Sequence, residues 1–184
     1  MAGLCRVCNS TRSRPFDLAY ESFVTFTRRN EENILRSRRL DLALAFGSEW
    51  APTLGAVRRY FVKHACCRIS DAGLRIGDDL LAYLDGQSPD APFYLFAEVR
   101  ADILERLGEG TSRTGSLWLG DLLGWHAPDD SHIIRVESHY GMGWLRFYWT
   151  YDPLARDWPD NMGVQVVALP EGRSLAPIQD NETG

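Results

Sequence analysis

Residues 132–151 read HIIRVESHYGMGWLRFYWTY, and this stretch decides the fold class. Up to residue 140, apolar and polar side chains alternate with the period of a β-strand. The Gly-Met-Gly segment at 141–143 has the composition of a hairpin turn. The return from Trp144 to Tyr151 holds five aromatic residues in eight and is bulky on both faces. The stretch therefore predicts an antiparallel hairpin whose second strand is covered on both faces or presents aromatic side chains to a partner.

The segments on either side of this hairpin are shorter or more ambiguous. Residues 152–163 hold two prolines and an asparagine, which predicts a long loop, and residues 164–169 predict a third strand. Residues 116–125 are apolar and fit either a strand or a helix. The C-terminal part is thus expected to form a small antiparallel sheet of about three strands.

Towards the N-terminus the apolar residues recur every three or four positions, the pattern of amphipathic helices. The predicted helices span residues 15–29, 31–46, 53–66, 78–86 and 93–107. About five helices followed by a small sheet indicate the α+β class.

Composition divides the chain of 184 residues into unequal halves. Residues 1–75 carry a net charge of +6 and residues 76–184 carry −11. We expect a basic helical region over residues 1–86, a loop of sequence QSPDAP over 87–92, an acidic α+β region over 93–170 and a frayed tail over 171–184.

The four cysteines all lie within the first 67 residues and suggest a metal site. Cys5 and Cys8 have the C-x-x-C spacing that holds one tetrahedral zinc ion from a tight turn. His64 and Cys67, three positions apart on a predicted helix, complete the expected zinc site, with Cys66 as a substitute for Cys67. The alternative is four free cysteines, two of them small buried apolar residues.

Basic side chains in the N-terminal part are candidates for contacts with the phosphates of a nucleic acid. The candidate nucleic-acid-binding residues are Arg36, Arg38, Arg39, Arg58, Arg59 and Lys63. The alternative is that they form a solvated face or pair with the acidic C-terminal part.

The aromatic strand is the candidate surface for a protein partner or for dimerisation. Its candidate partner-binding residues are Trp144, Arg146 and Tyr148, which alternate on one face of a regular strand.

Several classes of protein are disfavoured by the sequence. No apolar run approaches the roughly 20 residues of a membrane-spanning helix, and no signal peptide is visible. We therefore expect no membrane partner and a cytoplasmic or nuclear location, not a secreted one. Nineteen of the twenty basic residues are arginine, which suggests a GC-rich coding sequence from a bacterium, a phage or a virus.

For catalysis the chain offers ingredients without a motif. It contains no P-loop, nucleophile elbow or H-E-x-x-H sequence. A thiol-dependent hydrolase, with a cysteine nucleophile and a histidine from residues 126–139 as the base, is the weakest alternative.

The leading hypothesis is a non-enzymatic regulatory protein that binds nucleic acid through the basic N-terminal region, braced by zinc. In it the acidic aromatic part contacts a protein or forms a dimer. The rival hypothesis is a viral or phage-type protein-interaction factor that acts on a host protein without nucleic acid.

Overall fold

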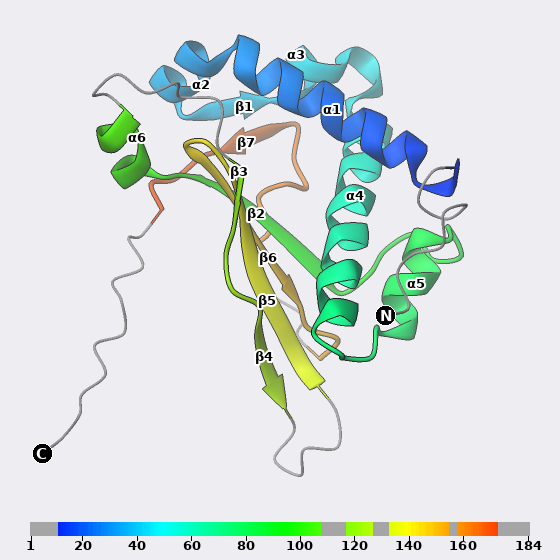
Figure 1. Ribbon diagram of the computed structural model, residues 1–184. Coiled ribbons are helices and arrows are strands. Elements are labelled where there is room, and N and C mark those ends of the chain that lie inside the picture. Colours follow the sequence, from blue (N-terminus) through cyan, green and yellow to red (C-terminus); the bar gives the residue numbers. More distant parts are fainter. Residues whose placement is uncertain (1–10, 108–116, 127–132, 155–157, 173–184) are drawn as a thin grey trace, which may run out of the picture.

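The computed structural model describes residues 11–107, 117–126, 133–154 and 158–172, and all structural statements below concern these residues (Figure 1). An antiparallel sheet lies at the centre, in the order β2-β6-β5-β3. Strand β4 pairs with the same edge of β5 as β3 does, at the other end of β5. Its strands are β2 (Phe93–Val99), β3 (Leu117–Leu119), β4 (Leu123–His126), β5 (Ile133–Met142) and β6 (Leu145–Tyr151). A separate pair joins β1 (Arg39–Asp41) to β7 (Val166–Ala168).

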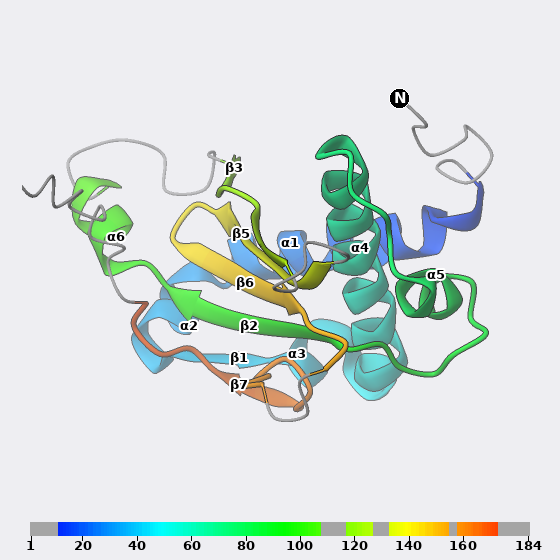
Figure 2. The same cartoon turned by 90° about the horizontal axis from the view of Figure 1, so that it is seen from below.

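The described helices are α1 (Arg14–Arg29), α2 (Glu31–Ser37), α3 (Leu42–Phe46), α4 (Trp50–Asp71), α5 (Asp78–Leu84) and α6 (Ala101–Leu107), with a short 3-10 turn at Gly47–Glu49. Of these, α1 and α4 pack on one face of the central sheet. Figures 1 and 2 show α4 running beside the sheet with α5 next to it. The long helices α1 and α4 also pack against each other.

The core forms where α1 and α4 meet the hairpin of β5 and β6. The ring centroids of Phe23 and Phe61, one from each helix, lie 5.7 and 4.9 Å from that of Phe147 on β6. A second aromatic cluster joins Tyr20 to Tyr140 on β5 through a 2.6 Å hydrogen bond between their hydroxyl groups. The buried residues of both halves of the sequence belong to one continuous apolar core.

The class remains α+β, but the expectation of about three strands after all the helices was wrong. The described residues contain seven strands in two sheets, and β1 and β2 lie between helices in the sequence. The ambiguous run 116–125 supplies two of them, β3 and β4. The central hairpin does form, with its turn at Gly143 and Trp144.

The predicted helix over residues 93–107 was also wrong over its first half. Residues 93–99 read FYLFAEV and form β2, paired along its whole length with β6. Alternate residues of this stretch are buried against the helices, so a period of two was present beside the period of three to four that suggested a helix. The helical part, α6, begins only at Ala101.

The predicted helix over residues 31–46 is interrupted at Arg38. This residue adopts the left-handed conformation, with φ 53°, and ends α2. Residues 39–41 then pair with β7, where Leu40 and Val167 face each other and are fully buried. The helical pattern fitted both halves, but the burial of Leu40 in a strand pair overrides it.

Candidate functional site

Both faces of β6 are largely covered. Leu145, Phe147 and Trp149 point towards the helices and are fully buried. On the opposite, outer face, Arg146 and Thr150 are also buried, and Tyr148 is half-buried. The expectation that both faces of this strand are covered therefore describes it better than a bare aromatic surface does.

An ion pair accounts for the burial of Arg146. Glu98 lies directly opposite on β2, and the guanidinium group of Arg146 binds its carboxylate. Both side chains are buried, and a Cβ at Gly172 would lie 2.7 Å from the carboxyl carbon of Glu98. The ion pair therefore joins β2 to β6, and the backbone at Gly172 packs closely against it.

The three candidate partner-binding residues are therefore placed differently from one another. Trp144 is only 3% exposed and lies in the hairpin turn, where its indole N–H donates to the carboxylate of Glu31. Arg146 is 6% exposed. Tyr148 has part of its surface exposed, and burial followed by its hydrogen bond to Glu137 raises its pKa to about 12.

Next to Tyr148, the guanidinium group of Arg135 lies between two indole rings. Its central carbon is 4.5 Å from the ring centroid of Trp125 and 4.1 Å from that of Trp158. Arg135 also forms an ion pair with Glu137. These contacts bind β4, β5 and the loop before β7 together by cation–π attraction, so the aromatic groups here already hold a cation of the chain itself.

His139 occupies the same outer face, directly opposite Tyr148 in the register of β5 and β6. Its ring centroid lies 5.1 Å from that of Trp118, and a Cβ at Gly120 would lie 2.0 Å from the imidazole. Burial, followed by nearby arginines led by Arg146, lowers the pKa of His139. The lowered pKa favours the neutral form of the imidazole.

In contrast to this packed face, the edge formed by β3 and β4 exposes apolar side chains. Leu117, Leu119 and Leu123 are 61%, 55% and 52% exposed, and Trp125 is also exposed. Directly opposed residues of an antiparallel pair share a face. The register therefore places Leu117 and Leu119 on the helix side and Leu123 and Trp125 on the outer side.

The outer backbone edge of β3 and β4 pairs with no strand in the described part of the chain. The other edge of the sheet is covered. Asn161 bonds to both the N–H and the carbonyl of Ala97 on β2, at 2.8 and 2.9 Å. Val99 donates to Pro170 and accepts from Gly172. The β3–β4 edge is the one on which an added strand would find unpaired backbone and apolar side chains together.

Of the six candidate nucleic-acid-binding residues, the three on α4 are held within the fold. Arg58 donates to Asp160 at 2.6 Å and to the carbonyl of Phe93 at 2.9 Å. Arg59 donates to the carbonyl of Tyr83 and stacks over its ring, and Lys63 binds Asp17 at 2.8 Å. Arg58 therefore matches the alternative in which basic residues pair with the acidic C-terminal part, whereas Lys63 pairs within the N-terminal part.

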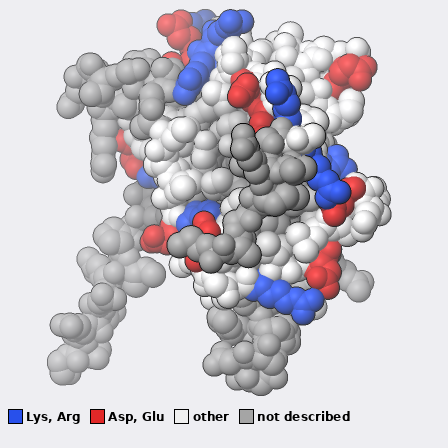
Figure 3. Space-filling model, turned by 45° about the vertical axis from the view of Figure 1, so that its right-hand side comes forward, with Lys and Arg blue, Asp and Glu red and all other residues white. Residues whose placement is uncertain are grey.

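The other three lie around the end of α2. Arg36 and Arg39 are exposed, and no hydrogen bond or ion pair of their side chains occurs within the described residues. Arg38 is half-buried, with one terminal guanidinium nitrogen buried and without a hydrogen-bond partner. On the face shown in Figure 3, the coloured basic and acidic groups are interspersed and form no extended basic surface.

Only two of the four expected zinc ligands can be placed, because Cys5 and Cys8 lie outside the described residues. His64 and Cys67 are both half-buried on α4, and the Nδ1 atom of His64 is buried without a hydrogen-bond partner. No group of three or more metal-ligating side chains occurs in the described residues. Burial is the main cause that raises the pKa of Cys66 to about 12, the opposite of what a thiolate nucleophile needs.

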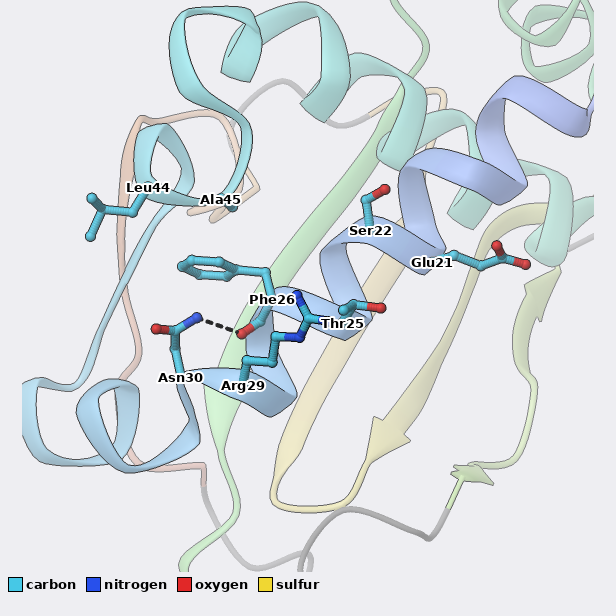
Figure 4. Close-up of a pocket in the computed structure, with 8 residues that line it drawn as sticks. All are labelled: Glu21, Ser22, Thr25, Phe26, Arg29, Asn30, Leu44 and Ala45. Carbon is cyan, nitrogen blue, oxygen red and sulfur yellow. Dashed lines mark hydrogen bonds between the residues drawn. The ribbon is translucent and has the colours of Figure 1, made fainter.

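A groove of about 660 Å³ lies between α1 and α3 (Figure 4). Figure 4 shows Phe26 pointing towards α3 and Arg29 running back along α1 towards Thr25. Glu21 lies one turn before Thr25 and points away from Phe26. Leu44 of α3 is 75% exposed at the margin of the groove. Sequence reasoning did not single out this groove, although the polar stripe along the 15–29 helix marks its exposed face.

Two further features escaped the sequence. Glu98 fell inside a predicted helix, so its pairing with Arg146 could not be anticipated, and the alternation in FYLFAEV was the available signal. The exposed edge arises from the run 116–125, whose apolar side chains suggested burial and whose type was ambiguous.

Comparison with known proteins adds no relative. No protein-family model, no curated protein and no solved structure matches this chain. Within the described residues, no helix combines the length and the apolar character that crossing a membrane requires.

Proposed function

We propose that this chain is a non-enzymatic protein-interaction factor that acts in the cytoplasm or nucleus and binds an extended segment of a partner protein along β3 and β4. The observation that supports it is an edge that pairs with no further strand in the described part of the chain and exposes four apolar side chains, Leu117, Leu119, Leu123 and Trp125. An extended peptide that joins a sheet edge gains main-chain hydrogen bonds, and alternate side-chain contacts give it specificity.

The apolar side chains lie on opposite faces at β3 and β4. A segment that pairs with β3 would therefore bury its apolar residues on the helix side. One that continues along β4 would bury them on the outer side. The occupant is expected to lie opposite residues 117–126, with an irregularity opposite Gly120–Leu122, where neither strand continues.

The test selects peptides from a displayed random library against the intact chain. Binding of the selected peptides is then measured for Leu119→Asp and Leu123→Asp. Leu154→Asp is the matched control, because Leu154 is 72% exposed and lies outside the edge. We expect affinity to fall at least tenfold in the two edge variants and to stay unchanged in the control. Equal binding by all of them would refute the proposal.

A second candidate function is nucleic-acid binding by the cations around α2. The observation that favours it is the exposure of Arg36 and Arg39 without internal partners among the described residues, beside Arg38. Binding to a duplex oligonucleotide should then weaken with salt, with a slope of roughly 0.9 for each phosphate contact. Arg36→Gln/Arg39→Gln should reduce the slope by about two, whereas Arg58→Gln should leave it unchanged.

Zinc also stays a proposal. In it Cys5, Cys8, His64 and Cys67 hold one ion that fixes the N-terminus to α4. Elemental analysis of protein purified without chelator tests it. About one zinc per chain, lost in Cys67→Ser and kept in Cys66→Ser, is the expected result, and a metal-free protein would contradict it.

A further inference from the structure

We propose that two copies of this chain pair through the groove between α1 and α3, with their α1 helices antiparallel about a two-fold axis beside Thr25. This interaction surface is separate from the β3–β4 edge and does not depend on the function proposed for that edge. The groove of each copy thus receives side chains from the α1 helix of the other copy.

The shape of the groove allows a helix to approach. Ser22 and Thr25 are small, exposed residues on the outer surface of α1, and Ala45 lies across from them on α3. Small side chains let two helix backbones come close together. Phe26 and the exposed Leu44 supply apolar surface at the margin, and the two-fold axis provides each of them twice. The volume of about 660 Å³ has room for several side chains of a facing helix.

The charged residues that line the groove of one copy are complementary to the same residues of a second copy. Glu21 and Arg29 line it, each four residues from Thr25, and both side chains are exposed. Four helical residues span about 6 Å along the axis. In an antiparallel pair centred on Thr25, Glu21 therefore lies opposite the partner's Arg29, and Arg29 lies opposite the partner's Glu21.

The antiparallel arrangement satisfies these charges, whereas a parallel pair in register does not. A parallel pair would place like charges opposite each other, which is unfavourable. Within the described residues neither Glu21 nor Arg29 takes part in an ion pair, so both are available for a second copy. The two-fold axis makes two such contacts in each dimer.

Sedimentation equilibrium of the full chain tests the proposal with charge reversals. Wild-type protein is expected to dimerise. Glu21→Arg and Arg29→Glu should each weaken dimerisation on the order of tenfold, because each creates two repulsive contacts. Glu32→Arg and Arg36→Glu are the matched controls, since both residues are exposed on α2 and do not line the groove.

The decisive measurement is an equimolar mixture of the two single variants. Glu21→Arg carries two positive groups in the groove and Arg29→Glu carries two negative ones, so a heterodimer of them has both contacts restored. The mixture, and the double variant Glu21→Arg/Arg29→Glu, should dimerise within about threefold of wild type. A monomeric wild type, unaffected single variants, or a mixture that stays monomeric would each overturn the proposal. Leu119→Asp should dimerise normally, which separates this result from failure of the proposed edge function.

Discussion

At the scale of single residues, the outer face of the sheet is held by ionic and aromatic contacts instead of an apolar layer. Glu98 and Arg146 form a buried ion pair across β2 and β6. Arg135 lies between the indoles of Trp125 and Trp158. Such groups are stable in a buried place only while each has its partner, because desolvating a lone charge is costly.

The buried pair gives the first prediction. Arg146→Met leaves Glu98 as an unpaired buried carboxylate and should lower the free energy of unfolding by about 3–5 kcal/mol. Adding Glu98→Leu to that variant should recover most of the loss, because no buried charge then remains. Urea unfolding of the two single variants and the double variant measures this. Strictly additive losses would show that the two side chains do not interact.

The second prediction concerns pH. Burial, followed by Arg68 and Lys63, lowers the pKa of His64, and the pKa of His139 is lowered too. The unfolded chain then binds more protons than the folded one as the pH falls through about 6.5. The free energy of unfolding should be greatest above pH 6.5 and fall on acidification to pH 5. His139→Gln should reduce this dependence, and an unchanged slope in that variant would contradict the assignment.

At the scale of elements, the sequence predicted what depends on local pattern and missed what depends on pairing. The helix over residues 15–29 is marked by apolar residues every three or four positions. The hairpin is marked by alternation and by the turn residues between its two neighbouring strands. The assignment of 93–99 as β2 depends on β6, some fifty residues away. The exposure of Leu117 and Leu119 arises because β3 pairs with no further strand among the described residues. The alternation in residues 93–99 allowed a strand without deciding it, and no local pattern shows where the sheet ends.

The third prediction tests the break at Arg38. Its positive φ places it in the left-handed region, where a Cβ costs roughly 1–2 kcal/mol. Arg38→Gly should therefore be more stable than Arg38→Ala by about 1 kcal/mol in thermal or urea unfolding. If residues 31–46 formed one continuous helix, the alanine variant would be the more stable, which is the contradicting result.

The fourth prediction concerns the covered edge. Asn161→Ala removes both hydrogen bonds to Ala97 of β2 and should lower the free energy of unfolding by about 1–3 kcal/mol. Hydrogen exchange of the Ala97 amide should accelerate more than that of amides inside β6. Unchanged exchange at Ala97 would show that this side chain does not cover the edge.

At the scale of the whole molecule, the charge division between the two halves of the sequence does not separate them in space. Arg58 of the basic half binds Asp160 of the acidic half, and the apolar core takes residues from both. One edge of the sheet is covered by residues 158–172, while the β3–β4 edge pairs with no further strand among the residues that the structure describes. The central claim of the account is that this open edge receives a partner.

Hydrogen–deuterium exchange of the chain with a selected library peptide tests that claim most directly. The account predicts that the peptide slows exchange of backbone amides in residues 117–119 and 123–126 and leaves the amides of β2 unchanged. It also predicts that the protection is lost in Leu119→Asp. Protection confined to α1, α2 or β2, with none at β3 and β4, would contradict the claim.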